Sequence, residues 1–234
     1  MKNRIFSGEK PEPTGTQTGN NRGFLDYIRI FWTHFWQLAF LNVVFCLACL
    51  PVVTIPAALA GMNRACIKLV QEGYVLVWLE FRDAFRKEFG KSLGLGVLFG
   101  GLLAGSYYLL SLGLSNGGNP YGLLFSGGGL CLLAIAVLWG QYSFVLLPSL
   151  DLPLGAILRN GWSLAFLGAP SSLGILVLEA AGVLFLVMLS PISLGIALFF
   201  GVAFVQYTIC SLVNFPQQKW ILEPFRRSQQ EGKP

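Results

Sequence analysis

Apolar residues fill long stretches of this chain, and polar residues gather between those stretches. The pattern predicts membrane-embedded helical segments at about 25–50, 54–70, 93–114, 121–147, 170–189 and 192–213. The last four are close to the 20 or so residues that a helix needs to cross a hydrocarbon core. We therefore predict an all-α, polytopic membrane helical bundle of about six segments.

Two features of the pattern qualify this division. The segment 54–70 is short, so it is either a full span or a tilted or re-entrant half-helix. The ends of the chain, 1–23 and 215–234, are polar and lack apolar periodicity, which is typical of tails outside the membrane. The membrane domain is accordingly expected over 24–214, with a disordered tail before it.

The stretch 73–91 has a different pattern, with one aromatic face and one charged face. The aromatic positions are Trp78, Phe81, Phe85 and Phe89, and the charged side includes Arg82 and Arg86. This spacing predicts an amphipathic helix suited to the inner leaflet of a membrane. The same face could instead bind a soluble partner.

Composition agrees with a membrane environment. Hydrophobic residues make up 54% of the 234 residues and charged residues only 12%, against about 25% charged residues in soluble domains. The formal net charge of +5 does not indicate nucleic acid binding, because the basic residues flank apolar stretches instead of forming a patch with stacking aromatics. The lipid bilayer is the expected surrounding.

The distribution of Lys and Arg predicts the topology. All 16 lie in the first 29 residues, in 64–91, at Arg159, or in the last 16 residues, and none lies in the turns near 51–54, 115–120 and 190–191. Because basic residues stay on the cytoplasmic side, six crossings with both ends inside fit this distribution. Five crossings, with 54–70 on the surface, would put the basic N-terminal tail outside and are the alternative.

A few polar or helix-breaking residues within the apolar segments are candidate functional positions. Glu179 lies near the middle of 170–189, where a carboxylate costs about 2–3 kcal/mol even on lenient insertion scales, so it is expected to face an interior or a water path. Asn42 and Gln141 are expected to form interhelical hydrogen bonds. Pro51 and Pro56 predict a helix break.

Four glycines in the third segment are spaced for close helix packing. They are Gly96, Gly100, Gly101 and Gly105. Small residues four positions apart let helices approach closely. Packing within the bundle is favoured, and a homo-oligomer is left open.

The sequence contains no recognisable catalytic, cofactor or metal set. His34 is the single histidine, and the five cysteines lie in or beside apolar segments without zinc-ligand spacing. The nucleophile motif Gly-x-Ser-x-Gly and the Walker A motif are absent. We therefore expect a protein that is not an enzyme.

One stretch resembles a known family. The resemblance rests on Leu41-Asn42, on 50–56 (Leu-Pro-Val-Val-Thr-Ile-Pro), on 68–70 and 72–74, and on the aromatic positions after them. These residues are similar to the YesL-like family of bacterial integral membrane proteins, from which the longer spacing between Tyr74 and Phe81 departs. The resemblance implies a bacterial cytoplasmic membrane protein encoded near carbohydrate ABC importers and two-component sensors, but it implies no activity.

Two functions follow as hypotheses. The first is a non-enzymatic accessory or regulatory protein for a carbohydrate ABC transporter or a membrane sensor kinase. The alternative is a small transporter or permease subunit that uses the broken helices and Glu179.

Overall fold

The computed structural model describes residues 24–117, 119–188 and 201–217, and their regular elements are all helical. The elements are α1 (Phe24–Thr33), α2 (Phe35–Ala48), the short 3₁₀ helix η1 (Val52–Thr54), α3 (Ile55–Glu72), α4 (Val77–Lys87), α5 (Phe89–Ser115), α6 (Pro120–Ser149), α7 (Leu154–Leu167), α8 (Ala169–Met188) and α10 (Val202–Gln217). The expected tail 1–23 lies outside the described residues, as do 218–234 of the expected tail 215–234 and the first part of the segment expected at 192–213. Residues 215–217 belong to α10.

Four helices of the described part are long and apolar enough to cross a membrane. They are Val52–Glu72, which joins η1 to α3, and α5, α6 and α8, while α2 and α10 are shorter. The all-α class and the presence of membrane-spanning candidates are therefore confirmed. The segment 54–70, expected to be marginal in length, belongs to one of the four.

Helix α3 is the centre of the packing. In its most apolar part, 56% of the residues are buried within the protein, against 17% in the corresponding parts of α5 and of α8. Small residues make this possible, because a side chain at Gly61 would lie 2.9 Å from the ring of Phe81 in α4. The helix ends at Gly73, whose φ of 79° is left-handed and suits glycine. Helices α2, α4, α5, α6 and α10 all contact α3.

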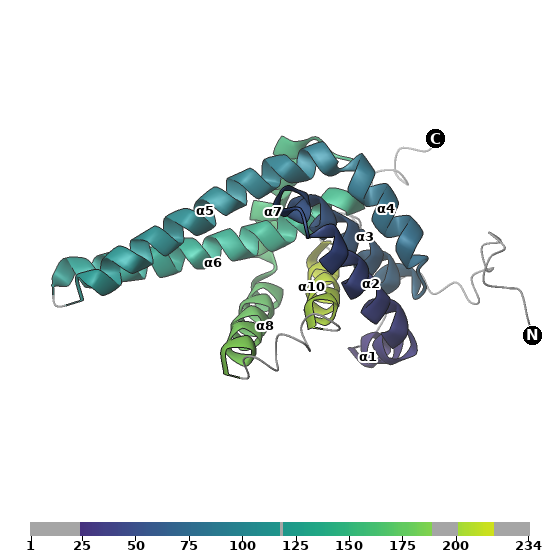
Figure 1. Cartoon of the computed structure of the whole chain (residues 1–234). Coiled ribbons are helices and arrows are strands. Elements are labelled where there is room, and N and C mark those ends of the chain that lie inside the picture. The colour runs from purple at the N-terminus through teal and green to yellow at the C-terminus, as the bar shows by residue number, and fades with distance from the viewer. Residues whose placement is uncertain (1–23, 118, 189–200, 218–234) are drawn as a thin grey trace, which may run out of the picture.

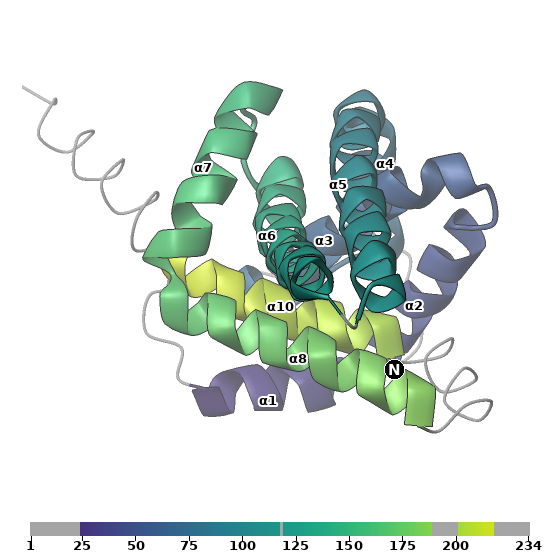
Figure 2. The same cartoon turned by 90° about the vertical axis from the view of Figure 1, so that its left-hand side faces the viewer.

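Helices α5 and α6 form a long hairpin that extends away from the other helices (Figure 1). Figure 2 looks along this hairpin and shows α8 and α10 running sideways across it. The described helices are therefore not the simple parallel bundle that six matched apolar segments suggest.

The first expected segment, 25–50, is wrong as a single helix. It is divided into α1 and α2 at His34, whose backbone leaves the helical region at φ −110° and ψ 19°. The His34 ring nitrogen Nδ1 lies 3.0 Å from the carbonyl oxygen of Ile30, and such local contacts compete with regular helix. The expected break at Pro51 and Pro56 does separate α2 from α3.

The amphipathic stretch also differs from the expectation. Helix α4 ends at Lys87, and Phe89 begins α5, so the aromatic face is not one continuous helix. Phe81 is 4% exposed and stacks on Phe85, whereas Trp78 is 57% exposed. Much of the aromatic face therefore packs within the protein, and Trp78 is the member that faces outward.

Two further helices correct the sequence interpretation. Helix α7, which contains Arg159, was not among the predicted segments, although Ile157, Gly161 and Leu164 form a buried face at helical spacing. Helix α6 continues through the three adjacent glycines Gly127–Gly129, although glycine is a poor helix former. Gly129 packs against Leu110 of α5, so the hairpin holds that part of α6 in helical form.

The three adjacent glycines allow a matched test of the hairpin packing. A Cβ at Gly129 would lie 2.9 Å from the Leu110 backbone nitrogen, whereas nothing lies within 4 Å of one at Gly128. We expect Gly129→Ala to lower the free energy of unfolding by about 1–3 kcal/mol through overpacking. Gly128→Ala should be neutral or raise it by up to about 1 kcal/mol. Unfolding in detergent measures both, and equal effects would contradict the packing.

Candidate functional site

Side-chain amides and one carboxylate form a continuous chain through the apolar interior. Glu179 of α8 accepts a hydrogen bond from the amide of Gln141 in α6. Gln206 of α10 donates to the side-chain oxygen of Gln141 at 3.3 Å, and also to the oxygen of Asn63 in α3. Four helices are thus joined through polar groups in surroundings that are otherwise apolar.

Burial makes these contacts matter to stability. Asn63 is fully buried and Gln206 is 4% exposed. In hydrocarbon or in a packed interior, an unpaired amide is costly, so each partner stabilises the other. The Nδ2 atom of Asn63 is the exception, because it has no hydrogen-bond partner within the described residues.

The structure brings two of the three predicted polar residues together. Glu179 and Gln141 bond directly, as above, whereas Asn42 accepts the backbone N–H of Ala203 at 2.8 Å and so fixes α2 to the start of α10. Asn63 and Gln206 were missed in the sequence. Gln206 stands among apolar and aromatic neighbours, and that pattern, which identified Gln141, would have found Gln206 as well. Asn63 is followed directly by Arg64, so the pattern does not single it out.

The predicted glycines do not form one packing face. Gly96 lies against the ring of Pro56, and a Cβ at Gly105 would lie 3.8 Å from the Cδ2 methyl group of Leu132 in α6. A Cβ at Gly100 or at Gly101 would meet nothing within 4 Å. Gly96 and Gly105 therefore pack against other helices of the protein, whereas no described residue packs against Gly100 and Gly101.

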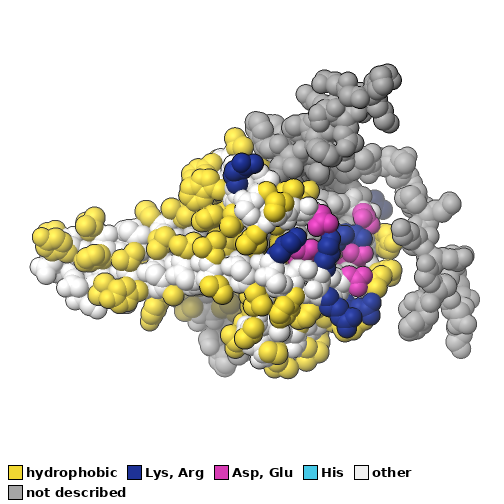
Figure 3. Space-filling view, turned by 90° about the horizontal axis from the view of Figure 1, so that it is seen from above, with side chains coloured by type: hydrophobic (Ala, Val, Ile, Leu, Met, Phe, Trp, Pro, Cys, Tyr) yellow, Lys and Arg dark blue, Asp and Glu magenta, His cyan; other side chains and the backbone are white. Residues whose placement is uncertain are grey.

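Charged residues form a second cluster near the start of α5 and the end of α6, at the end of the hairpin that is opposite its turn. In Figure 3, most Lys, Arg, Asp and Glu side chains gather at one end of the visible face, away from the apolar tip of the hairpin. The cluster lies where α3, α4, the start of α5 and the end of α6 meet. The sequence predicted the basic residues at this end, but not their pairing.

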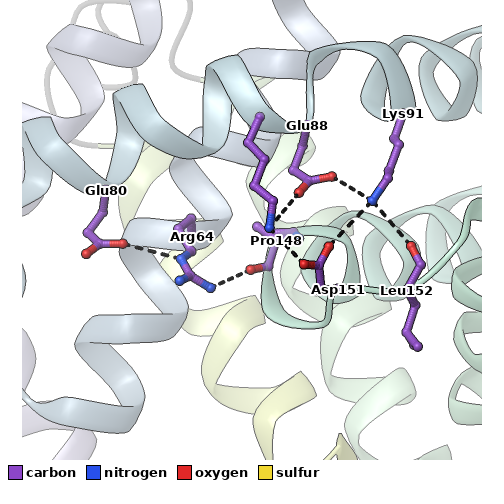
Figure 4. A network of polar contacts seen from close by, with 8 residues as sticks. Arg64, Glu80, Glu88, Lys91, Pro148, Asp151 and Leu152 are labelled. Carbon is purple, nitrogen blue, oxygen red and sulfur yellow. Dashed lines mark hydrogen bonds and ion pairs between the residues drawn. The ribbon is translucent and has the colours of Figure 1, made fainter.

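Ion pairs join the elements of this cluster (Figure 4). Arg64 of α3 contacts Glu80 of α4 at 3.3 Å and donates to the backbone oxygen of Pro148 in α6 at 2.6 Å. Lys68, one turn after Arg64, binds the other oxygen of Glu80. One carboxylate therefore faces two cations.

The loop between α6 and α7 is tied to the same cluster. Asp151 accepts a hydrogen bond from Lys87 at 3.1 Å, and Lys91 lies 3.3 Å from buried Glu88. The hydrogen bond from Lys87 lowers the pKa of the exposed Asp151 carboxyl below its ordinary value. Exposed pairs of this kind contribute little to stability individually, so the network orients the loop more than it stabilises the fold.

The cluster lines an open cavity of about 250 Å³. Its lining includes Arg64, Lys68, Glu80, Asp83, Lys87 and Glu88. Among the described residues, no group of three or more His, Cys, Asp and Glu side chains is placed to hold a metal ion.

Comparison with known proteins gives one match. Residues 35–108, which run from α2 into α5, match a family described as "Protein of unknown function, DUF624". This is consistent with the YesL-like resemblance, and it includes both Asn63 and the charged residues of α3 and α4. Neither the curated proteins nor the solved structures contain a significant match to the chain.

Proposed function

We propose that this chain is a non-enzymatic protein of the bacterial cytoplasmic membrane, with both ends in the cytoplasm, that acts as an accessory or regulatory partner of a carbohydrate ABC transporter or a sensor kinase. The class of partner rests on the YesL-like resemblance. The mode of action, which is association between membrane helices, rests on the α5–α6 hairpin.

The single observation that carries this mode is the exposed apolar hairpin. Helices α5 and α6 have 27 and 30 residues, and at 1.5 Å per residue each is about 40–45 Å long. Their outward side chains include Val97, Tyr107, Tyr108, Tyr121 and Leu123, each more than 60% exposed. A hairpin that is long enough to cross the bilayer and is covered by few other helices presents its surface to lipid and to neighbouring proteins.

The proposed orientation follows from charge. The charged cluster would lie on the cytoplasmic side, where Lys and Arg are retained, and the turn between α5 and α6 would lie outside. With this orientation the hairpin is a membrane-spanning arm, and α4 lies near the inner leaflet with Arg82 and Arg86 exposed.

Site-specific photocrosslinking in the native host tests the proposed association. A photoreactive residue in place of Tyr108, which is 63% exposed, should crosslink to a subunit of a carbohydrate importer or a sensor kinase. The same residue in place of Leu95, which is fully buried in the same helix, should not. Adducts with lipid alone at Tyr108 would contradict the proposed partnership.

The chain of polar contacts favours a second candidate, a small transporter or permease subunit. Glu179 is the ionisable member of that chain, and carboxylates within membrane segments often mark substrate or ion paths. The broken helices around Pro51 and Pro56 resemble the discontinuous helices of transporters. This candidate requires Glu179 to change its charge during transport.

A pair of substitutions separates transport from structure at this position. Glu179→Gln keeps a side chain that can accept the bond from Gln141, so the protein should remain folded while carbohydrate uptake falls at least about tenfold in cells that depend on it. Glu179→Leu removes the acceptor and should lower stability by roughly 1 kcal/mol as well. Unchanged uptake in the folded Gln variant would exclude the transport role for this residue.

A further inference from the structure

The hydrogen bonds that join α3, α10, α6 and α8 follow a fixed order of donors and acceptors. Gln206 Nε2 donates to the side-chain oxygens of Asn63 and Gln141. Gln141 Nε2 in turn donates to Glu179. From Gln206 to the carboxylate, every donor therefore points toward Glu179, which accepts without donating. This order is the one that an ionised carboxylate requires.

The same order leaves one buried donor unpaired. Asn63 is fully buried, and its oxygen accepts from Gln206 and lies 3.7 Å from the Cys210 sulfur. Its Nδ2 atom, in contrast, has no hydrogen-bond partner among the described residues. An enclosed donor without a partner is destabilising and is rare in native proteins.

The carboxylate has no described counter-charge. Helices α6, α7 and α10 pack against α8, and α8 and α10 lie side by side in Figure 2. The titratable side chains of these three helices are Tyr121, Cys131 and Tyr142 of α6, Arg159 of α7, and Tyr207 and Cys210 of α10. Within the described ranges, none of them bonds to Glu179. An ionised carboxylate in apolar surroundings without a cation beside it is costly, and protonation removes that cost.

A half-turn of each amide reverses the order of donors and acceptors. Such a half-turn exchanges the oxygen and the nitrogen of a side-chain amide, which have nearly the same shape. A protonated Glu179 then donates to Gln141. Gln141 and Asn63 both donate to Gln206, whose oxygen can accept two hydrogen bonds. The contacts between the four side chains are all kept, with their direction reversed.

The reversed order also gives the Asn63 nitrogen its missing partners. This nitrogen then donates to Gln206 and faces the Cys210 sulfur, a weak acceptor. The enclosed, unpaired atom of Asn63 becomes its oxygen, which proteins tolerate more often than an enclosed N–H group. The Gln206 nitrogen takes the place of its present oxygen, which is not among the fully enclosed unpaired atoms.

We propose that Glu179 is a proton-binding site, and that its protonation reverses the hydrogen bonds that run from α8 through α6 and α10 to Asn63 in α3. Glu179 takes one proton from water and forms one O–H bond, while each amide turns without gaining or losing a proton. The charge of Glu179 therefore determines which atom of Asn63 faces α10. In this way the contact between α3 and α10 depends on a residue of a third helix.

This inference deepens the transport candidate, because it names the proton as the ligand of Glu179. Its bearing on transport rests on that candidate, whereas the reversal rests on the contacts alone. The tests accordingly measure protonation and hydrogen bonding in the purified protein and not uptake. Loss of the reversal and loss of the transport role are therefore separate results.

Infrared difference spectroscopy of the purified full chain tests the protonation. A band from a protonated carboxyl group should be present at low pH and should be lost as the pH is raised. The band should be missing in Glu179→Gln, whose amide cannot ionise. A Glu179 carboxyl that stays ionised, or one that stays protonated, at every pH at which the protein is folded would overturn the proposal.

NMR of the side-chain amides tests the reversal. In protein with isotope-labelled asparagine, the Asn63 amide signals should shift with the same pH midpoint as the infrared band, because this group gains a hydrogen-bond acceptor on protonation. Asn214 is the matched control, since it accepts a hydrogen bond from Gln71 at 3.1 Å across the same two helices. Its signals should not shift at that midpoint.

Asn63 signals that stay unchanged while Glu179 titrates would overturn the reversal. Equal shifts at Asn63 and Asn214 would also overturn it, because they would show a general response of both helices. This comparison uses the unsubstituted protein, so it decides the question even if Glu179→Gln fails to fold.

Discussion

The cost of placing a polar group in an apolar interior constrains this structure more than any other interaction. Hydrocarbon and packed side chains offer no water to satisfy an amide or a carboxylate, so each must find a partner within the protein or lie at a surface. The chain meets this demand in two places. Asn63, Gln141, Gln206 and Glu179 bond to one another within the apolar region, and charged residues gather at one end, where they pair across elements.

These two clusters divide the molecule into regions with different roles. The amide chain holds α3, α6, α8 and α10 together. The charged cluster joins α3 and α4 to the end of α6 and to the loop that leads into α7. One of its contacts is the hydrogen bond from Arg64 to the backbone oxygen of Pro148. The hairpin of α5 and α6 extends from this body with an exposed apolar surface (Figure 1). In our proposal, the helices joined by these two clusters hold the fold together, and α5 and α6 bind neighbouring membrane proteins.

The sequence predicted those features that depend on the local chain. Apolar length predicted α5, α6 and α8 closely, and Pro51 and Pro56 marked the start of α3. It did not predict features that depend on tertiary contacts. The division at His34, the burial of Phe81 under α3 and the helical state of α6 at Gly127–Gly129 depend on packing between elements distant in sequence. Helix α7 was missed because its 14 residues are fewer than a membrane span needs.

The same distinction applies to the candidate sites. An isolated carboxylate or amide in an apolar segment is visible in the sequence, so Glu179 and Gln141 were identified, but their direct bond was not. The charged cavity could not be predicted, because its lining combines residues from 64–88 with Pro148. Only the fold brings these segments together.

The account depends on a chain that crosses the membrane with its charged cluster on the cytoplasmic side. Thiol labelling of intact cells tests this most directly, with single cysteines introduced into a variant that lacks the five natural ones. Asn116, at the end of α5, and Gly90, an exposed position beside the charged cluster, are suitable sites. We predict that a membrane-impermeant maleimide labels Asn116→Cys in intact cells and Gly90→Cys only after the membrane is opened. The reverse pattern, or labelling of both sites in intact cells, would contradict the account.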